Sequence, residues 1–182
     1  RIYDGNTDYP EEGSEDYELR LGFANDAVRG WAFDQNIQWR ELYTSLADAG
    51  SGDTVTTTAT SYEFPDDFVE ISSFVKIGET IYPYKKNDEV LNALQNNSHD
   101  RFFYITGNPR DGYTLNLNPA PDSDQPISYS YYRTPTTLVE DSDHPEMSKP
   151  YFIVNWVLAR LYELDNRNDL VMFYEQKAKN IM

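Results

Sequence analysis

Carboxylates are the side chains of this sequence most able to do chemistry, because 31 of its 182 residues are Asp or Glu. Glu63, Asp66 and Asp67 lie close enough along the chain to serve as the acid and base of a glycoside hydrolase. Carboxylates are so frequent here, however, that adjacency has little value, and a cap on a short turn after Pro65 explains these residues better. A hydrolase is therefore the weakest of the possible functions.

The two histidines, His99 and His144, lie in polar segments with acidic neighbours. Neither is accompanied by a serine motif or by a second metal ligand. The segment His144-Pro145-Glu146 has the H-x-E order of zinc deaminases, but their C-x-x-C partner cannot exist in a chain without Cys. We therefore expect no catalytic residue, no metal site and no cofactor.

The sequence leaves open whether four acidic residues in loops bind a metal ion. Asp122 with Asp124, and Asp141 with Asp143, have side-chain oxygens of the kind that bind Ca²⁺, although solvated loop acids explain them better. The absence of Cys also excludes disulfides and thiolate metal sites, which suits a chain that folds in a reducing cytoplasm.

Aromatic side chains are the other candidates for binding, since they make up 15% of the chain and Tyr alone occurs 15 times. In an extended segment, Tyr129 and Tyr131 point to one side of the sheet, and Ser130 and Tyr132 point to the other. Exposed rings there could stack on sugars, as in a carbohydrate- or receptor-binding β-module. A core strand whose phenols reach the rim is the favoured interpretation.

The net charge of −16 argues against binding to nucleic-acid phosphates, which requires clustered Lys and Arg. The longest apolar run, FIVNWVLA, is far shorter than a membrane span, so we expect no membrane partner. A chain of this length suffices for one domain with a real core.

Helical spacing marks the N-terminal part of the chain. Residues 1–14 carry acids, Gly and Pro without periodicity and are expected to form an arm. Ser14 is then a suitable N-cap for a helix whose apolar face combines Tyr17, Leu21, Ala24, Val28 and Trp31. Apolar residues over 39–46 predict a second, shorter helix that closes near Gly50.

Short strands are expected in the middle of the chain. The β-branched run over 55–60 predicts the first of them. Gly78 predicts the turn of one hairpin, and the NPRDG segment that starts at Asn108 predicts the turn of another. The block from Phe64 to Leu138 therefore has the pattern of a compact β-meander.

The C-terminal part is helical again, with apolar residues on more than one side of the segment that follows Pro150. The sequence therefore predicts an α+β fold: a helical bundle, made of N-terminal helices and a long C-terminal helix, with an inserted small antiparallel β-meander or sandwich. After the arm over 1–14, a single domain spans 15–182. Its parts are helices over 15–48, a β-rich insert over 53–138 and C-terminal helices over 149–182.

The order of these elements resembles the head-to-tail adaptor (connector, or head completion) proteins of tailed bacteriophages. The resemblance covers about residues 15–180. It is carried by DYELRLGFANDAVRGWA, FPDDF at Phe64–Phe68, YITG with YTLNLNPAP, YSYYRTPTTL, and KPYFIVNWVLARLYELDNRNDLVMFYEQKAK.

This resemblance implies a structural virion protein and no enzyme. It implies a ring of twelve copies that assembles in the host bacterial cytoplasm, binds beneath the portal protein and meets the tail or a stopper or nozzle protein. It also implies that double-stranded DNA passes through the ring without specific binding. The residues implied for portal docking are Tyr151, Phe152, Trp156, Phe173, Tyr174 and Met182. Those implied for the subunit or tail interface are Trp31, Trp39, Tyr129, Tyr131 and Tyr132.

Two features of the residues agree with the resemblance. A final helix with apolar residues on more than one side needs more than one packing partner, and a neighbouring subunit could supply the second. An acidic charge repeated around a ring would repel DNA phosphates and let the genome slide through.

Overall fold

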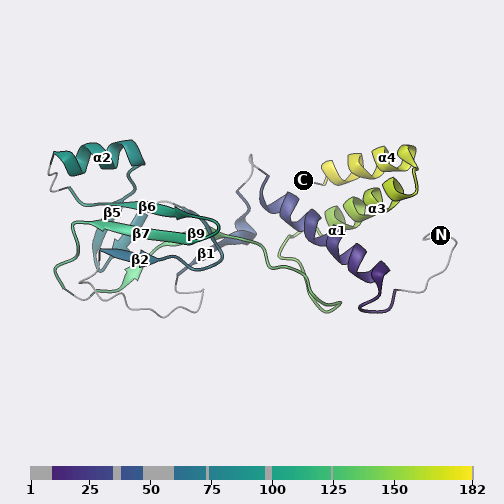
Figure 1. Ribbon diagram of the computed structural model, residues 1–182, viewed down its shortest axis with the longest axis horizontal. Helices are drawn as coiled ribbons and strands as arrows, with labels where there is room; N and C mark the ends of the chain where they lie inside the picture. Colours follow the sequence, from purple (N-terminus) through teal and green to yellow (C-terminus); the bar gives the residue numbers. More distant parts are fainter. Residues whose placement is uncertain are drawn as a thin grey trace. The chain divides into compact units, whose positions relative to one another are not determined.

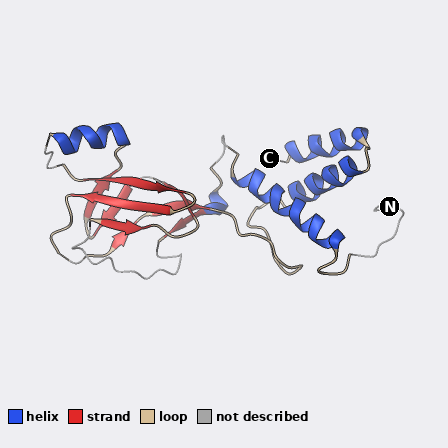
Figure 2. Cartoon of the chain, viewed as in Figure 1, coloured by secondary structure: helices blue, strands red, loops and turns tan. Residues whose placement is uncertain are grey.

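The computed structural model of the chain describes residues 10–34, 38–46, 60–72, 74–96, 100–123 and 125–181. The chain divides into two compact units. A helical unit is built from Arg1–Glu41 and Pro135–Met182, and a β-rich unit from Leu42–Thr134. Figure 2 shows the strands in the β-rich unit, which also carries the helix α2 (Asn87–Gln95).

The helical unit contains α1 (Glu15–Ala32), α3 (Tyr151–Leu164) and α4 (Asn168–Lys179). The predicted cap of α1 is confirmed, because the Ser14 side chain accepts a hydrogen bond from the Tyr17 amide at 3.2 Å. Helix α3 packs against both α1 and α4 (Figure 1). The second partner of this apolar helix, which the sequence argument assigned to a neighbouring subunit, is therefore α4 of the same chain.

The predicted bundle with a long C-terminal helix is wrong, although the α+β class holds. Helix α3 ends at Leu164, and Asn166 then adopts a left-handed conformation with a φ of 57°. Asn tolerates this conformation better than most residues, because its short polar side chain can bond locally. The chain reverses there, and α4 packs back onto α3.

The predicted second N-terminal helix is wrong as well. Residues Arg40–Leu42 form a single 3₁₀ turn, and Tyr43–Ser45 continue as the strand β1. Strand β1 pairs with the distant segment Ser130–Arg133, and the rings of Tyr43 and Tyr132 meet edge to face at 5.5 Å. Pairing with a distant strand thus outweighs the local helical spacing.

Within the described residues, nine short strands form three antiparallel sheets of three strands each, rather than one meander. Their orders are β1-β9-β3, β2-β7-β6 and β5-β4-β8. The remaining strands are β2 (Ser61–Glu63), β3 (Phe68–Ile71), β4 (Phe74–Ile77), β5 (Thr80–Pro83), β6 (Phe102–Asn108), β7 (Gly112–Asn118), β8 (Ile127–Ser128) and β9 (Ser130–Arg133).

Both predicted hairpins are confirmed, as β4–β5 and β6–β7. Gly78 turns the first with a φ of +54°, and a Cβ atom there would collide with the Gln125 side chain. The strand predicted over residues 55–60 lies outside the described residues except for Thr60.

The core of the β-rich unit is aromatic, as the composition suggests. Phe103 and Tyr131 are fully buried in it, with Leu115 and Val75 beside them. The preceding residue of β6, Phe102, forms a separate cluster with Val90 and Ala93 of α2. Successive residues of β6 therefore pack to opposite sides of its sheet.

Candidate functional site

One of the carboxylates considered for hydrolysis supports the core instead. Asp67 accepts a hydrogen bond from the Tyr131 phenol at 3.0 Å. Burial, together with this contact, raises the pKa of Tyr131 to about 12. In the described part of the chain, no group of three or more His, Asp and Glu side chains is arranged to hold a metal ion. His99 and Asp124 lie outside that part.

A groove of about 570 Å³ opens in the helical unit between α1, α3 and the segment 138–143. Its walls are mostly apolar and include Leu21, Leu138, Val154, Val157, Leu158 and Leu161. Pro10 also lines it, and Glu140, Asp141 and Asp143 give it an acidic edge. Apolar hollows of this size, with a few polar groups, are typical binding sites.

The third wall of the groove is held in place by hydrogen bonds. The Asn25 side chain donates to the Leu138 carbonyl at 2.9 Å and accepts from the Leu138 amide at 2.8 Å. Asp143 accepts from the amides of Val139 and Glu140, at 2.6 and 3.0 Å. These two amides hold the pKa of the Asp143 carboxyl below its usual value. The polar segment after β9 is thus an ordered wall, fastened to α1.

Two buried donors lie in the groove without a well-formed hydrogen bond: Tyr17 Oη and Arg20 Nε. Burial raises the pKa of Tyr17, and the nearby Asp141 carboxylate raises it further without completing a bond of good geometry. An unsatisfied buried donor is costly, so the groove favours a partner that brings hydrogen-bond acceptors.

Replacing Asn25 with Ala is expected to lower the free energy of unfolding by about 1–2 kcal/mol, because two hydrogen bonds to the Leu138 backbone are lost. Hydrogen exchange at the Leu138 amide should become at least about tenfold faster. Asp26→Ala, at the exposed neighbouring position, is the control and should change stability by less than about 0.5 kcal/mol. Unchanged exchange at Leu138 in the Asn25 variant would contradict this account of the wall.

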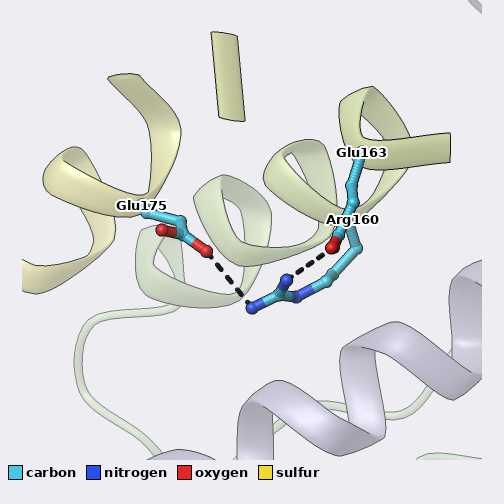
Figure 3. Close-up of polar contacts among 3 residues, drawn as sticks. All are labelled: Arg160, Glu163 and Glu175. Atoms are coloured by element: carbon cyan, nitrogen blue, oxygen red, sulfur yellow. Dashed lines mark hydrogen bonds and ion pairs between the residues drawn. The ribbon is translucent and has the colours of Figure 1, made fainter. Parts of the chain in front are cut away.

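Helix α4 is fastened to α3 by Arg160. Its guanidinium bonds Glu163 of α3 at 2.6 Å and Glu175 of α4 at 3.3 Å, as Figure 3 shows. The same guanidinium lies 4.7 Å from the centre of the Trp156 ring. The stacked rings of Tyr162 and Tyr174, 5.4 Å apart, join the two helices a second time.

Replacing Arg160 with Ala is expected to lower the free energy of unfolding by about 1 kcal/mol. The loss is small because both ion pairs are partly exposed and each contact contributes little by itself. Urea unfolding followed by Trp fluorescence measures the change. Arg29→Ala removes a looser pair with Asp26, at 3.8 Å, and should have no measurable effect. Equal stability of the two variants would show that Arg160 does not fasten α4.

The residues implied for portal docking lie in different environments. Tyr151 is 73% exposed and Phe173 is 50% exposed, so both are open to a partner. Phe152 is buried and packs against the half-buried Trp156. Tyr174 is half-buried in its stack with Tyr162. The last of the six, Met182, lies outside the described residues.

The residues implied for the subunit or tail interface are mostly internal. Trp31 is buried, and its carbonyl accepts a hydrogen bond from Trp39 Nε1 at 2.6 Å. Tyr129 and Tyr131 belong to the core of the β-rich unit. Burial raises the pKa of Tyr129 as well, so its phenol stays neutral. Tyr132 is half-buried beside Tyr43.

Sequence reasoning missed the groove. Asn25 lies among polar residues of α1, and nothing local indicates that it bonds a residue 113 positions away. Tyr17, Leu21 and Ala24 were expected on the apolar face of one helix, and Asp141 with Asp143 were considered as calcium ligands. Nothing in their spacing indicated that they line one groove. The apolar face of the N-terminal helix was the one signal in the sequence that pointed to this groove.

An exposed apolar groove with a few polar groups marks a binding site, for a ligand or for another protein. Compared with known families, residues 4–182 match the family described as SU10 adaptor protein. The chain belongs to this family of phage adaptor proteins, and the resemblance to head-to-tail adaptors is confirmed. Phage adaptors are structural components of the virion. No curated protein matches the chain. Among the described helices, none is both long and apolar enough to cross a membrane.

Proposed function

We propose that copies of this chain form a ring of twelve beneath the portal protein, where they join the capsid to the tail and line the DNA exit channel. The match of residues 4–182 to an adaptor family carries this proposal. The ring assembles in the host bacterial cytoplasm. Its far side receives the tail, or a stopper or nozzle protein.

The charge of the chain supports the passage of DNA. Each copy carries a formal charge of −16, which a ring of copies would multiply. Such a surface repels phosphates, and contact without attraction leaves DNA free to slide. The ring would therefore guide the genome without binding it.

Portal docking is proposed for Tyr151 first, because it is the most exposed of the implied residues that the structure describes. Phe173 is exposed as well, so it is open to the portal or to a second copy of the chain. Phe152 supports this surface from the core and does not reach a partner itself. The carbohydrate-binding alternative is less well supported, because the rings of Tyr129 and Tyr131 are buried and cannot stack on a sugar. Tyr132, the ring on the opposite face, is half-buried against Tyr43.

Removal of the gene from its phage tests the proposal. The expected product is heads without attached tails, counted by electron microscopy of lysates. Supply of the gene from a plasmid should restore joined particles, which controls for effects on neighbouring genes. Tailed, infectious particles in the absence of both copies of the gene would overturn the proposal.

A further inference from the structure

We propose that the groove between α1 and α3 of one subunit receives the outward face of α4 from a second copy of this chain. This inference rests on the proposed function, because a ring requires a contact that repeats from subunit to subunit. It specifies the two surfaces that meet and the chemistry that joins them.

The receiving surface has three properties that define its occupant. Its walls are apolar, and Val154 is 51% exposed within it. Its edge is acidic, with Glu140 and Asp141 both exposed to solvent. Its buried donors, Tyr17 Oη and Arg20 Nε, lack well-formed hydrogen bonds. The occupant should therefore combine apolar side chains, positive charge and hydrogen-bond acceptors.

The outward face of α4 carries this combination. Tyr174 and Ala178 face inward, since Tyr174 stacks on Tyr162 of α3 and Ala178 is buried. Met172 and Phe173 are 67% and 50% exposed, on the opposite side of the helix. Lys177, one turn beyond Phe173, places its Nζ 4.5 Å from the centre of that ring.

Charge and hydrogen bonding both favour the match. The last turn of α4 holds two basic residues, Lys177 and Lys179, in a chain that is otherwise strongly acidic. These lysines complement the acidic edge of the groove, whereas most other faces of a second copy would be repelled. Gln176 donates from its amide nitrogen to Asn180, and its carbonyl oxygen can accept from Tyr17 or Arg20 of the neighbour.

The geometry of the contact fits a ring. The groove and the outward face of α4 are different surfaces of one chain, so their contact is heterologous and repeats head to tail. Such a contact closes into a ring when the rotation between neighbours is suitable. Phe173 then serves the contact between subunits, and Tyr151 stays available to the portal.

Cysteine cross-linking tests this contact without background, because the chain contains no Cys. The double variant Val154→Cys/Phe173→Cys is mixed with the portal protein of the same phage and oxidised. A ladder of covalent oligomers is expected on a denaturing gel, since each subunit links to the next. Either single variant should give no species larger than a dimer. The pair Leu158→Cys/Met172→Cys repeats the test if the first variant does not fold.

A charge exchange provides a second, independent readout. In the variant Lys177→Glu, a negative charge on α4 would meet Asp141 in the groove of the neighbouring copy. This repulsion should lower the yield of portal-bound rings about tenfold. Adding Asp141→Lys to that variant should restore the yield. If the wild-type protein forms rings with the portal, two results would overturn this contact alone. One is the absence of a ladder from the double-cysteine variants, and the other is a charge exchange without effect on ring yield. Failure of the wild-type protein to form rings with the portal would instead overturn the proposed function.

Discussion

Replacing Trp31 with Ala is expected to lower the free energy of unfolding of the isolated protein by about 3–5 kcal/mol. The side chain is 3% exposed, and its ring lies 5.1 Å from that of Trp39. Its removal leaves a cavity at the end of α1 that the neighbouring side chains cannot fill completely. Urea unfolding followed by the fluorescence of Trp39 and Trp156 measures the loss, because both lie in the helical unit.

The matched control is Phe33→Ala, two residues further along, where the aromatic side chain is 52% exposed. In that variant, the free energy of unfolding should fall by less than about 1 kcal/mol. The comparison decides whether Trp31 stabilises the core or forms a subunit interface, as the resemblance implied. Normal stability of the isolated Trp31 variant, combined with failure to assemble, would restore the interface interpretation.

Replacing Phe103 with Ala is expected to have an effect of similar size on the β-rich unit, about 3–5 kcal/mol. Phe103 is fully buried in the aromatic core, and its ring lies 5.3 Å from that of Tyr84. Strands β6 and β7 should therefore exchange their amide hydrogens faster in the variant. Hydrogen exchange measured by mass spectrometry locates the loss, and urea unfolding followed by circular dichroism gives its size.

Phe74→Ala is the control for this experiment, since Phe74 belongs to a neighbouring sheet but is exposed. Its effect should stay below about 1 kcal/mol. Equal losses in the two variants would mean that the core is not centred on Phe103 and its neighbours.

Features set by neighbouring residues could be predicted from the sequence. Ser14 and the acids after it located the start of α1, because capping depends on residues within one turn. Gly78 located the turn of the first hairpin, because a positive φ suits Gly locally. Alternation along the strand placed Tyr129 and Tyr131 on one face, but it could not show that this face is the buried one.

Features set by distant residues could not be predicted. Tyr43 lies in a run with helical spacing, yet it pairs with Tyr132, almost ninety positions away. The groove depends on Asn25 reaching Leu138, and that contact has no local pattern.

Electron microscopy of the purified protein mixed with the portal protein of the same phage tests the central claim most directly. The adaptor account predicts a ring of this chain attached to one end of the portal, with a channel along its axis. The portal is included in the mixture because binding to a partner can order segments and rearrange loops or domains of a free protein. A stable monomer that leaves the portal bare at both ends would contradict the account.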